Sequence, residues 1–405
     1  MVLVRFSESP RRKTAGVSLL ALLAFVVAVS ARPSGQTAAS DDAIARLGRK
    51  LAAGGAALEY RDQGGYLPSL LELLDIRIDS QVLVFSKTSF QHALISPKNP
   101  RAVYFNDNVA IGMVPGGTVY EMVALESSHG LAFYTLDTQK SDRPAFQRRG
   151  VECLFCHAPG NKGANALVVA SVIPLPDGSP AYTSAFIDTI DHRTPFSRRW
   201  GGWYVTGTHG PQRHMGNAVA SDAEHTLDLD RHGTQNVTSL ADRFDVHKYL
   251  APTSDIVALM TLEHQVGAVN RLGALGVQYR NAERTGLLSK ADEARIDGEV
   301  RDLVDYLVFK DEAPFEAPVQ GVSPFTQTFP ASGPRDSHGR SLREFDLRTR
   351  LFKYRLSYMV YSDLFDAMPQ ALKARVYRRL SEVLETRDPV ALAIARETKS
   401  DFPHY

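Results

Sequence analysis

The chain has 405 residues, of which 44% are hydrophobic and 22% are charged, and its formal net charge is +1 at pH 7. This content is sufficient for one large hydrophobic core or two smaller ones. The near-neutral charge argues against a polyanion-binding surface, so we expect no nucleic acid partner.

The first 31 residues have the parts of an export signal. Basic residues lie between Arg5 and Lys13, an apolar stretch covers residues 17–29, and small residues precede the site after Ala31. This order is typical of a signal peptide, which we predict over 1–31. Retention of the segment as an N-terminal anchor is the alternative. We expect the mature protein to be periplasmic or otherwise exported, without a transmembrane segment.

Residues 32–79 are expected to form a helical or linker segment, and residues 80–235 a β-rich region. Runs rich in Val, Ile, Phe and Tyr alternate there with polar or Gly/Pro-containing turns, which predicts antiparallel strands. A polar turn at 106–108 favours a hairpin. The predicted strands cover 81–86, 102–106, 108–114, 118–126 and 131–136, with further strands over 166–173, 182–188 and 201–208.

The chain's two cysteines, Cys153 and Cys156, lie in the stretch VECLFCHAPG and are followed directly by His157. A thioredoxin-like redox pair would need a buried strand before it, and RPAFQRRGVE does not have that pattern. A zinc site would need two more ligands, and the pair His209 and His214 is distant in sequence. Covalent attachment of haem c accounts for all three motif residues. We therefore expect one covalently bound haem, with His157 as proximal ligand of its iron.

Through Cys153, Cys156 and His157 the chain resembles the c-type cytochromes. The stretches SQVLVFSKTSFQ, ISPKNPRAVYFND and RRWGGWYVTGTHG also look similar to large single-haem cytochrome c domain proteins. The resemblance implies haem attachment on the outer side of the bacterial cytoplasmic membrane, which agrees with the predicted signal peptide. It implies no particular reaction.

The ligand on the far face of the iron distinguishes an electron carrier from a catalyst. In the small cytochromes c this ligand is a methionine downstream of the motif. Met215, in the Gly/Pro-rich loop THGPQRHMGN, is the first candidate here. The alternatives are His209, His214, His264, Met113, His192 and an open site.

The stretch DHRTPFSRRWGG gathers cations close to Trp200 and Trp203. Its arginines are candidates to hold haem propionates by charge-assisted bonds, although a solvated strand end explains them equally well. The two tryptophans are candidates for contacts with the haem or for the protein core. The charged and histidine residues of this stretch are Asp191, His192, Arg193, Arg198 and Arg199.

Residues 236–405 are expected to be helical, with a Pro-rich loop over 313–334 whose phenylalanines hold it to the protein body. A period near 3.6 predicts helices over 239–250, 254–275 and 290–310. A capping box from Ser341 to Glu344 predicts a fourth helix that ends before Pro369. The expected fold is α+β, with an antiparallel β-rich N-terminal half that carries the haem motif and a helical C-terminal half.

These features predict an exported monohaem protein that transfers single electrons between periplasmic redox partner proteins. The alternative is a haem-dependent, peroxidase-like oxidoreductase with an open distal face, and a third hypothesis is a ligand sensor. We favour the carrier because the sequence offers distal ligands but no recognisable acid–base set, and we assign no catalytic residue.

Overall fold

The structure is a computed structural model that describes residues 41–150, 152, 153, 157, 164–181, 188–221, 229–284, 286 and 289–403. The predicted signal peptide lies outside the described residues. The described residues all belong to one compact unit.

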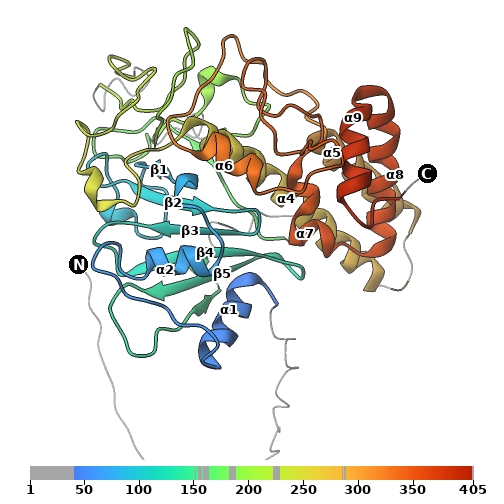
Figure 1. Ribbon diagram of the computed structural model, residues 1–405, viewed down its shortest axis with the longest axis horizontal. Helices are drawn as coiled ribbons and strands as arrows, with labels where there is room; N and C mark the ends of the chain where they lie inside the picture. The colour runs from blue at the N-terminus through green and yellow to red at the C-terminus, as the bar shows by residue number, and fades with distance from the viewer. Residues whose placement is uncertain are drawn as a thin grey trace, which may run out of the picture. The chain divides into compact units, whose positions relative to one another are not determined.

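A seven-stranded antiparallel sheet forms the centre of the N-terminal half (Figure 1), in the order β6-β5-β4-β3-β2-β1-β9. A separate two-stranded sheet pairs β7 with β8. The strands are β1 Val82–Val84, β2 Arg101–Phe105, β3 Val109–Met113, β4 Val119–Glu126, β5 Gly130–Asp137, β6 Gln147–Arg149, β7 Ala170–Ser171, β8 Asp188–Thr189 and β9 Trp203–Tyr204.

Strands β1 to β5 lie where strands were predicted between residues 81 and 136, so these predictions are confirmed. Their alternating side chains point to opposite faces of the sheet. The hairpin at 106–108 is confirmed as well. The Asn106 side-chain oxygen accepts hydrogen bonds from the backbone N–H groups of Asn108 at 3.0 Å and Val109 at 2.9 Å. The strands expected over 166–173 and 201–208 shrink to the two-residue β7 and β9. Most of the one expected over 182–188 lies outside the described residues.

Two hydrophobic cores lie on the two faces of the sheet. The second core joins α1 (Ala43–Ala52) and α2 (Leu67–Leu73) to one face through residues such as Leu70, Tyr104 and Met122. The main core joins the other face to the C-terminal helices through residues such as Leu131 and Leu259. Because both faces are covered, the strands between them are largely buried.

Helices make up most of the C-terminal half, so the fold is α+β as predicted (Figure 1). None of the described helices is both long and apolar enough to span a bilayer. The helices are α4 Ile256–Arg284, α5 Lys290–Leu307, α6 Phe325–Ala331, α7 Asp363–Asp366, α8 Gln370–Arg387 and α9 Pro389–Thr398. Short 3₁₀ turns cover Ile78–Ser80, His92–Leu94, Phe196–Arg198, Val246–Lys248 and Tyr358–Tyr361.

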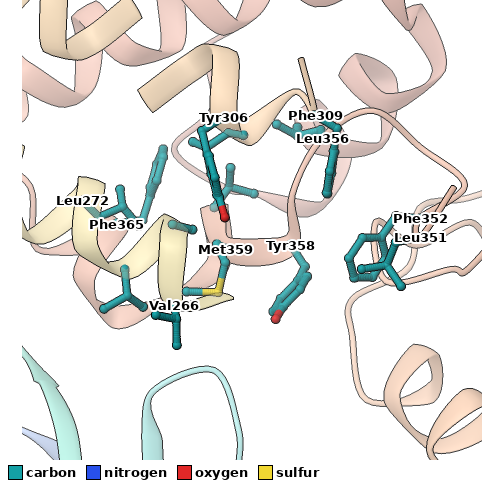
Figure 2. Close-up of a cluster of buried hydrophobic side chains, with 14 of the residues drawn as sticks. Val266, Leu272, Tyr306, Phe309, Leu351, Phe352, Leu356, Tyr358, Met359 and Phe365 are labelled. Carbon is teal, nitrogen blue, oxygen red and sulfur yellow. The ribbon is translucent and has the colours of Figure 1, made fainter. Parts of the chain in front are cut away.

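Helix α4 is the central element of the main core, and Figure 2 shows part of its packing. Residues Val266 and Leu272 lie close to Tyr306, Met359 and Phe365 there. The helix is buried on nearly all sides, and its buried residues include the polar Glu263, His264 and Gln265. Its N-terminus is capped by Asp255, whose carboxylate accepts from the backbone N–H of Val257 at 2.8 Å. The helices predicted over 254–275 and 290–310 are therefore confirmed.

The predictions of helices over 239–250 and from Ser341 to Pro369 are wrong. The first segment contains only the 3₁₀ turn Val246–Lys248. In the second, the Ser341 backbone N–H does donate to the Glu344 side chain at 3.0 Å, but the chain then forms an irregular loop. The loop ends in the 3₁₀ turn Tyr358–Tyr361 and the short α7. The Pro-rich loop contains α6, and Phe315, Phe325 and Phe329 are buried in the main core, as expected.

Candidate cofactor-attachment site

The described part of the motif lies just after β6, at the edge of the main core. Cys153 is half-buried and packs against that core. Its backbone N–H donates to the Gly150 carbonyl at 3.1 Å, which turns the chain after β6. Cys156 lies outside the described residues. The structure therefore places one of the two predicted thiols and the histidine of the motif.

His157 is held in one orientation by backbone and ring contacts. Its Nδ1 lies 2.9 Å from the Ala166 carbonyl oxygen, and its own carbonyl accepts from the Ala166 N–H at 2.6 Å. Its ring stacks on Phe133 of β5, with the ring centroids 5.0 Å apart and the planes at 27°. Because a carbonyl only accepts, Nδ1 carries the proton and Nε2 keeps a lone pair.

The His157 imidazole has the charge state that a metal ligand needs. Burial lowers the pKa of His157, which favours the neutral ring at neutral pH. A neutral ring whose second nitrogen donates to a carbonyl is the usual arrangement of a metal-bound histidine. Nε2 of His157 can therefore bind an iron without any change at Nδ1.

An arginine beside His157 leaves a donor unpaired. The Arg101 guanidinium on β2 pairs with Glu121 of β4, with Nη2 to Oε2 at 2.8 Å, and its buried Nε has no hydrogen-bond partner among the described residues. Gly112 of β3 makes room for it, because a Cβ there would lie 2.2 Å from Nη2. The unpaired Nε fits a carboxylate such as a haem propionate.

Met215, the first candidate for the distal ligand, lies in a different cluster from His157. It packs with Ile173 and Ala220 in a small group separate from the main core. The Ser171 hydroxyl donates to its sulfur at 3.7 Å, a weak contact. The structure does not bring Met215 together with His157. Met113, on β3, belongs to the second core.

His209 and His214 lie side by side in the protein interior, with ring centroids 4.7 Å apart. The His209 Nε2 accepts from the Asn236 N–H at 3.1 Å, and the His214 Nδ1 accepts from the Gly216 N–H at 3.0 Å. Burial lowers the pKa of both rings. A ring nitrogen that accepts from a backbone N–H is the unprotonated one, so in both neutral rings the lone pair that could bind iron is already used.

His264 has both ring nitrogens occupied in the described structure. Its Nδ1 lies 2.9 Å from Nδ1 of His192, and its Nε2 lies 2.7 Å from the Ser357 hydroxyl. The ring is fully buried between Tyr306 and Phe309. Binding iron would break one of these hydrogen bonds, so the geometry does not favour His264 as the distal ligand. His192 uses only its Nδ1 in this contact, and its buried Nε2 has no hydrogen-bond partner among the described residues.

The cationic stretch at 191–199 has a structural partner that the sequence did not indicate. Arg199 pairs inside the protein with Glu263, whose other oxygen accepts from Trp200 Nε1 at 2.9 Å. Arg199 is therefore not available for haem propionates. Trp203 also belongs to the main core, and its Nε1 donates to the Ala170 carbonyl at 2.7 Å. The neighbours Glu263 and His264 have different side-chain partners, but the two sets meet at His192, because Arg199 also donates to the His192 carbonyl at 3.0 Å.

Within the part of the chain that the structure describes, one group of side chains has ligand atoms close enough for a metal ion: Asp336, His338 and Glu397. Arg340 already occupies the Asp336 carboxylate, with its Nε donating at 2.7 Å. The Glu397 carboxylate accepts from the Ser337 N–H at 2.7 Å. These contacts account for the cluster without a cation.

Comparisons with protein families, with curated proteins and with solved structures found no match to this chain. The interpretation of the site therefore depends on the residues themselves. The elements that converge on it are the turn after β6, strands β2 to β5 and the segment after Ala164. Only the motif residues among them were visible as a site in the sequence, because Arg101, Gly112 and Phe133 come from separate strands.

Proposed function

We propose that this protein is an exported c-type cytochrome that holds one haem and transfers single electrons between redox partner proteins of the periplasm. Cys153 and Cys156 would each form a thioether link, and His157 would bind the iron. The observation that carries the proposal is the orientation of His157 within the C-x-x-C-H motif, with Nδ1 on the Ala166 carbonyl and Nε2 left as a ligand.

The residues around His157 fit this cofactor. Cys153 lies against apolar side chains, and Phe133 backs the imidazole. The unpaired Arg101 Nε offers a donor for a carboxylate. When bound, a haem iron supplies a one-electron couple whose potential depends on axial ligation and burial. The chain's part is to hold the imidazole still and to keep water from one side of the metal.

Covalent attachment is the direct test. In a host with a cytochrome maturation system, each cysteine thiol would add across one haem vinyl group, so that an S–C bond forms and the thiol proton moves to the second vinyl carbon. We expect the denatured protein to carry the mass of one haem. The double variant Cys153→Ser/Cys156→Ser should carry none, whereas His129→Ala, an exposed histidine outside the motif, should be unchanged. A colourless unsubstituted protein would refute the proposal.

Redox behaviour separates a carrier from an enzyme. We expect a reversible one-electron titration of the purified protein and no turnover of hydrogen peroxide with a dye as electron donor. Peroxide turnover that is lost in His157→Ala but kept in His129→Ala would instead assign a haem-dependent oxidoreductase.

A further inference from the structure

A surface groove lies between the segment at the end of α2, the loop before α4 and the loop before α6. Its lining residues fall within 71–79, 251–253 and 322–324, and its volume is about 630 Å³. Pockets that bind small molecules have volumes of roughly 300–1,000 Å³. The groove is therefore large enough for an organic molecule of several carbon atoms.

Apolar side chains line this groove and remain open to solvent. Ile78 is 44% exposed and Val322 is 38% exposed, and the exposed Pro252 and Pro324 line the same groove. These four residues come from three segments that are distant in sequence, so folding brings their apolar surfaces together. Exposed apolar residues that gather around one hollow mark a place for an apolar ligand.

Hydrogen bonds fix the walls, so the groove is already formed. The Gln81 Nε2 donates to the Thr253 carbonyl at 2.7 Å and holds the loop before α4. The Asp255 Oδ2 accepts from the Val322 N–H at 2.8 Å and holds the loop before α6. A ligand that enters a preformed site loses little affinity to reorganisation of the protein.

The groove keeps one negative charge without a cationic partner. Of its three carboxylates, Glu72 pairs with Arg61 at 2.8 Å and Asp79 lies 3.4 Å from Arg77. Asp75 is exposed and has no ion pair among the described residues. Three carboxylates and two guanidiniums leave a net charge of −1 at the groove.

Asp79 adds an acceptor to the groove wall. Its side chain is 9% exposed, and its Oδ1 has no hydrogen-bond partner in the described part of the chain. The Thr328 hydroxyl donates to the other oxygen at 2.7 Å. Arg77 Nε lies 3.4 Å from Oδ1 without the geometry of a hydrogen bond. A buried carboxylate oxygen in this state favours a closer N–H donor.

We propose that this groove binds a primary alkylammonium ion. The N–H groups of the ion would donate to Asp75 and Asp79, and its alkyl chain would lie along Ile78 and Val322. One positive charge matches the single uncompensated negative charge, and an alkyl chain matches the apolar walls. The lining contains no residue of the cofactor-attachment site, so the inference is independent of the proposed function.

The chemical class is tested by isothermal titration calorimetry of the purified protein with hexylammonium, hexanol and hexanoate. We expect saturable binding of hexylammonium to a single site, about tenfold weaker binding of hexanol and none of hexanoate. Each methylene removed from the alkylammonium should weaken binding by up to about fourfold. Equal affinities for hexylammonium and hexanol, or no saturable binding of hexylammonium at millimolar concentration, would overturn the proposal.

The charge is tested by Asp75→Asn against Asp311→Asn. Both aspartates are exposed and have positive φ angles, 54° and 60°, which asparagine tolerates. We expect Asp75→Asn to weaken hexylammonium binding about threefold and Asp311→Asn to leave it unchanged. Arg77→Gln should strengthen binding, because it removes the cation beside Asp79. Equal affinities of the two asparagine variants would contradict the role of Asp75.

The apolar wall is tested by Ile78→Ser against Leu94→Ser. Both residues lie in 3₁₀ turns, and they are 44% and 43% exposed. We expect Ile78→Ser to weaken hexylammonium binding severalfold and Leu94→Ser to leave it unchanged. Binding that neither serine weakens would place the alkyl chain outside the groove and overturn the proposal.

Discussion

Glu263 is a buried carboxyl group whose charge state ties stability to pH. Its side chain is fully buried beside Arg199 and Trp200. Burial raises the pKa of Glu263 from 4.5 to about 7, against the opposing effect of Arg199. Between these two values the folded chain holds a proton that the unfolded chain has lost. The stabilising effect of this proton is complete below pH 4.5 and disappears as the pH rises to about 7.

We therefore predict that Glu263→Gln removes part of the pH dependence of stability. The free energy of unfolding of the unsubstituted protein should fall between pH 5 and pH 8 by on the order of 1–3 kcal/mol more than that of the variant. Denaturant titrations at the two pH values measure this difference. An equal fall in both proteins would mean that Glu263 remains ionised beside Arg199.

Gly112 allows the Arg101 side chain to lie across β3. A Cβ at this position would come within 2.2 Å of Nη2 and 2.6 Å of Nε. We predict that Gly112→Ala displaces the guanidinium from Glu121 and lowers the free energy of unfolding by about 1 kcal/mol, even though alanine is the better strand residue. The denaturation midpoint measures this loss.

Gly298→Ala in α5 is the control for Gly112→Ala. The nearest atom to a Cβ there is 3.7 Å away, on Arg301. With no clash, alanine should raise the free energy of unfolding by about 0.5–1 kcal/mol through its higher helix propensity. Stabilisation by both alanines would show that Arg101 does not need the space above Gly112.

At the scale of elements, α4 is anchored by three consecutive polar residues whose partners lie in segments distant from α4 in sequence. Glu263 binds Arg199 and Trp200, His264 binds His192 and Ser357, and Gln265 binds Asn106 and Tyr358. The contact of Gln265 with the Asn106 carbonyl ties α4 to the turn between β2 and β3. Buried groups that are all hydrogen-bonded fix one packing of a helix that hydrophobicity alone would leave free to rotate.

We predict that Ser357→Ala loosens this anchor. The Ser357 oxygen lies 2.7 Å from His264 Nε2 and accepts from the Met359 N–H at 3.1 Å. Its removal leaves a fully buried imidazole nitrogen unpaired and should lower the free energy of unfolding by about 1–3 kcal/mol. Ser332→Ala, at an exposed serine, should change it by less than about 0.5 kcal/mol. Equal effects in urea titrations would contradict a structural role of the His264 contact.

Sequence periodicity correctly predicted the strands up to residue 136 and helices α4 and α5. Each of these elements is regular and packs its apolar side chains into a core. Periodicity failed at 341–368, where apolar spacing resembles a helix. There the Asp346 carboxylate accepts from the backbone N–H groups of Arg348 and Thr349, and Leu347 has a φ of 58°. Local side-chain hydrogen bonds of this kind compete with helix formation.

The same failure occurs at 239–250, and it has the same cause. The Asp245 side chain accepts from the His247 N–H and stops the chain in a 3₁₀ turn. Phe244 and Tyr249 reach the second core from this irregular backbone. Their spacing reflects contacts with the sheet, which a helical period cannot reveal.

Long-range pairing explains why the motif was predictable and the partners of the other histidines were not. Cys153, Cys156 and His157 are neighbours in sequence, so their chemistry is visible there. His264 meets His192 across 72 positions and Ser357 across 93. Its place on a helix face resembled that of a ligand, but these contacts give it a role in packing.

At the scale of the whole molecule, the two cores share the same sheet. Tyr120, Met122 and Ala124 of β4 lie in the second core, and Val123 and Leu125 pack in the main core, so loss of either core exposes a strand that supports the other. The chain's two tryptophans, Trp200 and Trp203, both lie in the main core. Their fluorescence therefore reports on the main core, while far-ultraviolet circular dichroism reports on the backbone of both.

We predict that Leu70→Ala, in the second core, shifts the unfolding curve recorded by tryptophan fluorescence. Leu70 is fully buried on α2, and its truncation should cost about 2–5 kcal/mol. With a shared sheet, the fluorescence and circular dichroism curves should move together to lower denaturant concentration. Leu73→Ala, on the same helix but 38% exposed, should move neither curve appreciably. The two cores would unfold independently if Leu70→Ala left the fluorescence curve unchanged while the circular dichroism curve separated into two transitions.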